Sequence, residues 1–402
     1  MIANKDSDLN KIRLGVFLIA VHFLLTPLDF YPIFSGISIV RILSVIPISG
    51  CLLQIPNQKI KFNKYIIILL FYFLLILLSS LYSVDIHKTY SRALSVGSNI
   101  LFIIILTTID YNEKEIFFLK RIMVFSGWLV LALILIFSSY ELTEGRLTLH
   151  MRGAAQDPNY LVGYLMFTFV YYFNGLITRK RWINIIYIGI ILYIILMTGS
   201  RGGIIAIIGS VAFCFFLWLK SNRIKPKTIS IMALAFVSIT ITIIYIFRYL
   251  PEAIVNRFYI SYTIKDRGAN RFDIWISIVN NYKNFPFFNL IFGQGAGTIL
   301  NFTNGNAGHN LWLEHLLELG FIGLFILIVM YLVFFAKILH LKENVVTSVF
   351  LGYILLTMSL SLYSYKPIWN IIIIILIHNN YYDRKHILPK NLDEQQLMHM
   401  TN

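Results

Sequence analysis

Apolar residues fill most of this chain in long runs that short polar segments separate. About twelve runs are long enough to cross roughly 30 Å of hydrocarbon as helices. Many are rich in Ile and Phe, which also favour strands, but their length and lack of two-residue alternation favour helices, which satisfy their own backbone hydrogen bonds in lipid. The runs lie at 12–28, 37–54, 65–82, 91–109, 116–138, 159–176, 183–198, 203–219, 228–247, 310–336, 345–363 and 367–382.

One polar stretch, residues 248–309, is much longer than the other interruptions. Within it Asn270 can cap a helix, and Asp273 follows three residues later as in a variant of the capping box. Asn310 is a suitable N-cap for the next apolar span. Apolar residues at helical spacing predict that the helix after Asn270 is amphipathic and lies on the membrane surface; they are Phe272, Trp275, Ile276, Val279 and Tyr282.

The pattern predicts an all-α integral membrane protein with about 12 transmembrane helices and one long extracytoplasmic loop that contains short amphipathic helices. We divide the chain into transmembrane helices 1–9 at residues 1–247, the loop at 248–309, transmembrane helices 10–12 at 310–382 and a cytoplasmic tail at 383–402.

The composition agrees with a membrane protein. The 402 residues are 58% hydrophobic and only 13% charged, whereas soluble domains are about a quarter charged. The formal net charge is +15, but the basic residues form short clusters between apolar runs, which is typical of topology signals rather than of a nucleic-acid surface. Cys51 and Cys214 both lie inside apolar runs, so neither a disulfide framework nor a thiol metal site is readable.

The positions of Lys and Arg predict the orientation. If the N-terminus is cytoplasmic and twelve spans alternate, every cytoplasmic segment carries two to four basic residues. The positive-inside rule then places both termini in the cytoplasm and the long loop outside. The short outer loops hold few basic residues, namely Lys88, Arg146, Arg152, Arg201 and Lys366.

The outer face therefore collects arginines, and the long loop adds further cations to them. Guanidinium groups stay charged and make bidentate contacts with phosphate oxygens, and fixed cations in a dry site stabilise the charge that develops on a diphosphate leaving group. A histidine can accept the proton of an attacking hydroxyl. Arg201, Arg271 and His309 thus form a suitable set for displacing a diphosphate with an alcohol.

Simpler interpretations of these residues stay open on the residues alone. Arg201 could reach to lipid headgroups as an interfacial side chain, and Arg271 could pair with Asp273 or Glu252. His309 could simply end a loop. Two other features also need a structural account: Asp157-Pro158-Asn159 is typical of a turn with Pro near the first helical position, and Arg41 and Arg92 lie near or within spans, where a charge is costly unless it faces a polar interior.

Several motifs occur in an order that resembles a known family. They are Gly153…Asp157-Pro158-Asn159, Ser200-Arg201-Gly202, Arg271-x-x-x-Trp275, Phe292-Gly293-Gln294-Gly295 and His309-Asn310-x-x-Leu313-x-x-x-Leu317-Glu318-x-Gly320-x-x-Gly323. Over roughly residues 146–330 the chain resembles the O-antigen ligase/O-antigen polymerase superfamily.

The resemblance implies a glycosyltransferase of the cytoplasmic (inner) membrane that takes a glycan from an undecaprenyl diphosphate carrier on the outer side, without a metal, cofactor or nucleotide sugar. It implies that Arg201 and Arg271 bind the diphosphate and that His309 activates the acceptor. Further substrate contacts are expected from Arg146, Arg152, Asn159, Asn310 and Glu318. The expected partners are the lipid-linked oligosaccharide, a glycan acceptor, membrane lipid and a chain-length regulator, and no nucleic acid.

The acceptor is not decided by any residue. We expect a polymerase of O-antigen, capsule or exopolysaccharide, because many surface-polysaccharide clusters need one such enzyme each. A ligase, which transfers the glycan to a lipid A-core acceptor, stays open. A flippase for lipid-linked sugars is the alternative from another class, and it would need charges at mid-membrane depth, where only Arg41 and Arg92 qualify. A purely structural scaffold would not need the arginine–histidine set.

Overall fold

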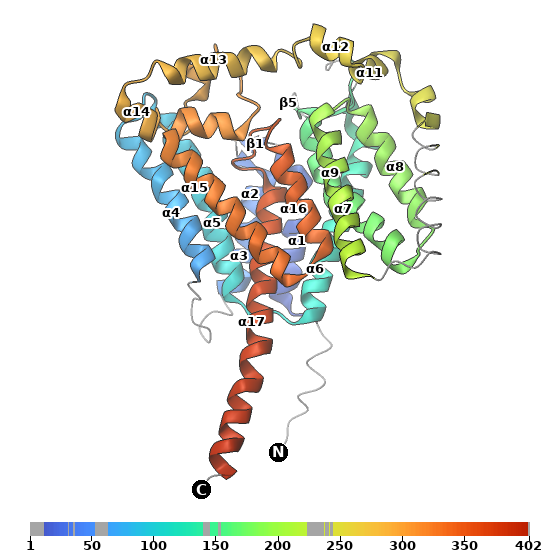
Figure 1. Ribbon diagram of the computed structural model, residues 1–402, viewed down its shortest axis with the longest axis vertical. Helices are drawn as coiled ribbons and strands as arrows, with labels where there is room; N and C mark the ends of the chain where they lie inside the picture. The colour runs from blue at the N-terminus through green and yellow to red at the C-terminus, as the bar shows by residue number, and fades with distance from the viewer. Residues whose placement is uncertain are drawn as a thin grey trace.

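The computed structural model describes residues 12–30, 32–34, 37–52, 63–139, 145–151, 154–222, 237, 241 and 244–400. In this part of the chain, long helices run side by side as a bundle, and a layer of short helices crosses one end of it (Figure 1). Five strands of two to four residues form two small antiparallel sheets: β1 (Pro32–Phe34) pairs with β2 (Ile37–Ser38), and β4 (Thr148–Met151) lies between β3 (Ser138–Ser139) and β5 (Ala154–Ala155).

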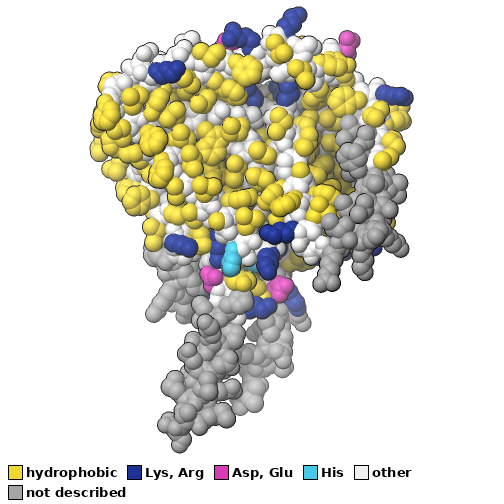
Figure 2. All heavy atoms as spheres, in the orientation of Figure 1, with side chains coloured by type: hydrophobic (Ala, Val, Ile, Leu, Met, Phe, Trp, Pro, Cys, Tyr) yellow, Lys and Arg dark blue, Asp and Glu magenta, His cyan; other side chains and the backbone are white. Residues whose placement is uncertain are grey.

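Six described helices are long and apolar enough to cross a membrane. They are α4 with its final 3₁₀ turn (Lys64–Leu81), α5 (Ile86–Thr108), α6 (Glu113–Phe137), α7 (Pro158–Arg179), α9 (Arg201–Ser221) and α15 (Leu311–Leu341). Shorter apolar helices are α1 (Leu14–Leu25), α8 (Asn184–Met197) and α16 (Asn344–Leu356). Hydrophobic side chains cover the middle of the face in Figure 2, with Lys and Arg concentrated toward its two ends, as expected for a multi-pass membrane protein.

The predicted count of twelve spans is not confirmed by the described residues. The run at 37–54 forms two short helices, α2 (Ile39–Leu43) and α3 (Val45–Leu52), and the helix expected at 345–363 ends at Leu356. The run at 228–247 lies mostly outside the described residues. The last span begins α17 (Lys366–Met400), which continues as a helix through the region predicted to be a polar tail.

The helix α15 is broken at Gly320, where the backbone has φ 66° and ψ −165°. A side chain there would overlap the carbonyl of Ile291 in α14 (Phe287–Phe292), so only glycine fits. The loop after α14 fills the break: the amide of Gly295 donates to the Glu318 carbonyl at 2.8 Å, and that of Gln294 donates to the Leu317 carbonyl at 3.2 Å. These bonds satisfy carbonyls that a helix end would otherwise leave unpaired.

Small residues bring α9 and α16 close together. A methyl group added at Gly202 would overlap the Ser359 hydroxyl just beyond α16, and one at Gly352 would overlap the hydroxyl of Ser210. Small residues at such a seam let two helix backbones approach within van der Waals contact in lipid.

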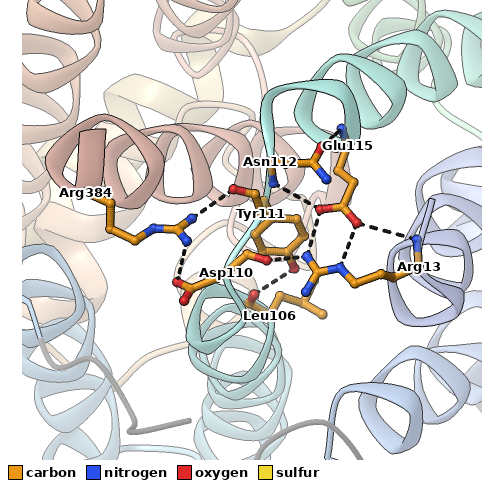
Figure 3. A network of polar contacts seen from close by, with 7 residues as sticks. All are labelled: Arg13, Leu106, Asp110, Tyr111, Asn112, Glu115 and Arg384. Atoms are coloured by element: carbon orange, nitrogen blue, oxygen red, sulfur yellow. Dashed lines mark hydrogen bonds and ion pairs between the residues drawn. The ribbon is translucent and has the colours of Figure 1, made fainter. Parts of the chain in front are cut away.

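The opposite end of the bundle is held by a polar network (Figure 3). Asn112 and Glu115 form a capping box at the start of α6. The Glu115 carboxylate also accepts from Arg13, at 2.8 Å from Nε and 2.7 Å from Nη2. Arg384 of α17 donates to the Tyr111 carbonyl at 2.8 Å and pairs with Asp110 at 3.2 Å. The beginning of α1 and the middle of α17 therefore meet at the end of the bundle away from the short helices.

The crossing layer contains α11 (Glu252–Arg257), α12 (Ile260–Lys265), α13 (Arg271–Lys283) and α14. Helix α13 packs Ile278 against Ile299 and Leu317, while Phe272 and Ile276 are exposed. The prediction that Asn270 caps this helix is wrong: Asn270 has φ 62° and makes no capping hydrogen bond, because the four residues 267–270 form a left-handed turn.

Candidate active site

A cavity of about 340 Å³ lies between α9, the end of α16 and the crossing layer. Its polar lining includes four arginines and one asparagine: Arg146, Asn159, Arg201, Arg257 and Arg271. Its apolar lining is Ile205, Leu355, Met358, Phe272 and Trp275. The structure therefore brings Arg201 and Arg271, seventy positions apart in the sequence, to one cavity.

Arg201 is the first residue of α9, and the turn before it is tightly held. Ser200 caps the helix by accepting from the Gly203 amide at 3.0 Å, and its hydroxyl donates to the side chain of Asn159 at 2.6 Å. This bond ties the start of α9 to the start of α7. The guanidinium of Arg201 forms a two-pronged ion pair with Asp266, which follows α12. Arg201 is thus bound by a carboxylate from the crossing layer, rather than reaching freely to lipid headgroups.

Arg146 and Arg257 bind the carbonyl end of α8. Arg146 donates to the Thr198 carbonyl at 2.9 Å, and Arg257, which is 7% exposed, donates to the Gly199 carbonyl at 3.4 Å. Cations at a helix C-terminus are favoured by the helix dipole. The two arginines therefore have structural partners and still face the cavity.

Arg271, at the start of α13, differs from the other three arginines. Within the described residues it makes no hydrogen bond and no ion pair. Asp273, one of the partners considered for it, instead pairs with Arg267 at 2.9 Å, and no ion pair joins Arg271 to Glu252. Arg271 therefore lines the cavity with a guanidinium that no described residue accepts a hydrogen bond from.

The electrostatics of Arg271 follow from this position. Burial lowers the pKa of Arg271, the carboxylate of Asp157 opposes that change, and the positive charges of Arg201 and Arg257 lower the pKa further. An anion in the cavity would relieve this repulsion.

His309 lies beside this group, although it does not line the cavity. Its Nδ1 is 4.0 Å from Oδ2 of Asp157. Burial lowers the pKa of His309 and Arg271 lowers it further, while Asp157 acts in the opposite direction. The imidazole is therefore held neutral near neutral pH, which is the form that accepts a proton.

The backbone at His309 is fixed by contacts on both sides. The residue has φ 50°. The indole of Trp275 donates to the Gly308 carbonyl at 3.0 Å, and the amide of Leu311 donates to the Thr357 carbonyl at 2.9 Å. Trp275 lies one turn after Arg271 in α13, so the helix that carries the unpaired arginine also holds the histidine loop.

The other residues predicted to contact substrate lie in different places in the structure. Asn159 lines the cavity, whereas Asn310 caps α15, as predicted, by accepting from the amides of Trp312 and Leu313. Glu318 is fully buried and accepts from the Ile299 amide at 3.0 Å and the Tyr363 hydroxyl at 2.8 Å. Both residues use their side-chain oxygens to hold the fold, and a contact of either with substrate stays a prediction. Arg152 lies outside the described residues.

Three polar residues near the cavity were not predicted as site residues: Asp157, Arg257 and Asp266. Asp157 caps α7 with Pro158 at the first helical position, as the turn pattern predicted. Its second role, facing His309, has no local signal in the sequence. Among the described residues no group of three or more His, Cys, Asp or Glu side chains is placed to hold a metal ion.

Arg92 has a polar environment inside the bundle. Its guanidinium stacks on the ring of Tyr363 at 4.1 Å, and Tyr363 in turn bonds to Glu318. This contact accounts for a charge within a span. The side chain of Arg41 lies outside the described part of the chain.

Comparison with known proteins finds a similarity over the part of the chain that carries this site. Residues 186–328 match a family model described as O-antigen ligase. The comparison with curated proteins gives no match. A chain from the structural study "Structural coordination of polymerization and crosslinking by a peptidoglycan synthase complex" is similar at 16% identity and a TM-score of 0.44, covering 78% of this chain and 97% of that one. Residues 186–328, which include Arg201, Arg271 and His309, are thus similar to the O-antigen ligase family, and this match supports the O-antigen ligase/polymerase superfamily that the motifs resemble.

Proposed function

We propose that the protein is a polymerase of a surface polysaccharide (O-antigen, capsule or exopolysaccharide). It transfers an undecaprenyl-diphosphate-linked glycan to a hydroxyl of a lipid-linked repeat unit on the outer side of the cytoplasmic membrane. The observation that carries this proposal is Arg271: a partly buried guanidinium, without a hydrogen-bond partner among the described residues, in a cavity that three other arginines also line. Such a site suits a ligand with several phosphate oxygens.

In this proposal, the neutral imidazole of His309 takes the proton of the acceptor hydroxyl as its oxygen attacks the anomeric carbon of the donor glycan. The bond from that carbon to the diphosphate oxygen breaks, and the electron pair leaves with undecaprenyl diphosphate. The guanidinium groups of Arg271 and Arg201 stabilise the charge that gathers on the leaving group.

The apolar side of the cavity supports a donor with a hydrocarbon chain. Ile205 on α9 and Met358 after α16 are 63% and 52% exposed, and both line the cavity. Exposed apolar side chains on membrane-spanning helices face lipid. A diphosphate among the arginines could therefore extend its prenyl chain past these residues into the bilayer.

The proposed outer location rests on charge placement. The cavity is lined by residues of the crossing layer, and Figure 1 shows that layer at the end of the bundle opposite the two chain termini, near which the network of Arg13 and Arg384 lies. The basic clusters of the sequence assign the latter end to the cytoplasm.

The matching family model is described as O-antigen ligase. If this protein were a ligase, its acceptor would be a lipid A-core. The same cavity and the same histidine would serve that reaction, because the two reactions differ only in the acceptor hydroxyl.

The test is the pair of variants His309→Ala and Arg271→Ala in the source organism, with membrane levels measured by immunoblot. We expect each to abolish long-chain surface glycan, since a general base contributes about 10²–10⁴-fold in rate. Arg267→Ala, an exposed arginine four residues from Arg271, is the matched control and should leave glycan length unchanged. Single repeats accumulating on the carrier indicate a polymerase, and long chains stranded on it indicate a ligase. Normal glycan in the His309→Ala strain would refute transfer at this site.

A further inference from the structure

We propose that Asp157 is a positioning residue that orients the imidazole of His309 and selects which of its nitrogens acts as the base. The inference rests on the proposed function for its role in transfer, but the Asp157–His309 contact itself can be tested without any activity.

The two oxygens of Asp157 have different surroundings. Oδ1 accepts from the Asn159 amide at 2.8 Å and from the Asn159 side chain at 2.5 Å, which fixes the carboxylate at the start of α7. Oδ2 faces Nδ1 of His309 at 4.0 Å. One oxygen is thus held by α7, and the other is directed at the histidine.

Among the described residues, the imidazole of His309 makes no hydrogen bond, and its ion-pair partner there is Asp157. The His309 backbone is fixed by the Trp275 bond to Gly308 and by the N-cap at Asn310, but neither contact touches the imidazole. A carboxylate facing Nδ1 favours the tautomer with its proton on Nδ1, which leaves the lone pair on Nε2. Nε2 is then the nitrogen that accepts the proton of a hydroxyl.

Charged groups from three elements surround the ring. Asp157 comes from α7 and Arg271 from α13, with Arg201 and Arg257 close to Arg271. Glu314 of α15 packs against Gly308: a methyl group added at Gly308 would lie 2.6 Å from Cγ of Glu314. Burial and Arg271 lower the pKa of His309 and Asp157 partly offsets them. Removing the Asp157 charge should therefore lower the pKa of His309 further.

The test uses the full-length protein in detergent micelles. Diethyl pyrocarbonate reacts with neutral imidazole, so its rate of reaction at His309 against pH, followed by peptide mass spectrometry, gives the pKa directly. His87, which is exposed, is the internal reference. Asp157→Asn keeps an oxygen to accept from the Asn159 amide, so the helix cap is retained while the charge is lost. Asp273→Asn, near Arg271 but paired with Arg267, is the matched control.

We expect the His309 midpoint to move to lower pH in Asp157→Asn, to stay in place in Asp273→Asn and to return toward the original value in Asp157→Glu. With lipid-linked oligosaccharide as substrate, Asp157→Asn should lower the maximal transfer rate by at least about tenfold with little change in the Michaelis constant.

An unchanged midpoint in Asp157→Asn would overturn the inference, even if His309→Ala is inactive. A shifted midpoint together with full transfer by His309→Ala would instead keep the pair and reject the proposed function.

Discussion

Arg201 and Arg271 line the same cavity, but among the described residues a carboxylate pairs with Arg201 and none pairs with Arg271. Asp266 holds Arg201 with both oxygens, whereas Arg271 has no such partner in the described residues. In the proposed function, a diphosphate would compete with Asp266 for Arg201, whereas no carboxylate among the described residues forms an ion pair with Arg271.

Replacing Asp266 with Asn should strengthen binding of an anion in the cavity. The ion pair is partly exposed, with side chains 20% and 21% accessible, so we expect its loss to tighten inorganic pyrophosphate binding roughly fivefold, equivalent to about 1 kcal/mol. Isothermal titration of the purified protein measures this, with Asp273→Asn as a control that should not change affinity. Weaker binding in Asp266→Asn would mean that Asp266 shapes the site rather than competing for it.

The sequence predicted the arginines of the cavity better than it predicted their partners. Arg201, Arg271 and Asn159 were recognisable because motif order and outer placement single them out. Asp266 and Arg257 were not, since their contacts depend on how the crossing layer folds over α9. Glu318 was also singled out by its motif position, and in the structure its carboxylate makes hydrogen bonds within the protein, a role that the motif alone does not reveal.

At the scale of elements, the break in α15 sets the position of His309. The segment from Leu311 to Leu319 is a separate short helix, and the loop after α14 fills the gap at Gly320. The hydrophobic run at 310–336 predicted one uninterrupted span, because a single glycine in an apolar run does not by itself show that its backbone leaves the helical region.

Gly320→Ala should strongly destabilise the protein. Its φ and ψ belong to a region that only glycine adopts readily, and the new methyl group would overlap the Ile291 carbonyl, so we expect a loss of more than about 3 kcal/mol. Gly189→Ala in α8 is the matched control, because nothing lies within 4 Å of the added methyl group; it should be neutral or stabilise by up to about 1 kcal/mol. Thermal unfolding in detergent compares them. Equal melting temperatures would show that the break is not required.

An apolar run in the sequence does not show whether the helix it forms is continuous. The run at 37–54 looks like a span, yet it forms α2 and α3 with a turn at Ser44 between them. The hydroxyl of Ser44 contacts Nδ1 of His22 in α1 at 3.1 Å. Such a break depends on contacts with another helix, which periodicity within one segment does not contain.

At the scale of the whole molecule, the orientation in the membrane is open to a direct test. Asn284 at the end of α13 and Lys342 at the end of α15 are both exposed. In a background with Cys51 and Cys214 replaced by Ser, we expect Asn284→Cys to react with a membrane-impermeant maleimide on intact cells. Lys342→Cys should react only after permeabilisation, because basic clusters mark its end as cytoplasmic. The reverse labelling would place the cavity on the inner side and exclude an outer transferase.

The seam between α9 and α16 has a mechanical consequence for the cavity. Gly202 and Gly352 leave no room for even a methyl group between these helices, so we expect this wall of the cavity to be rigid. The opposite wall contains the segment around Asp266, which an ion pair joins to Arg201 of α9. In the proposed function, a lipid-linked diphosphate that competes with Asp266 for Arg201 would loosen this ion pair, so that ligand binding and opening of the cavity would be coupled.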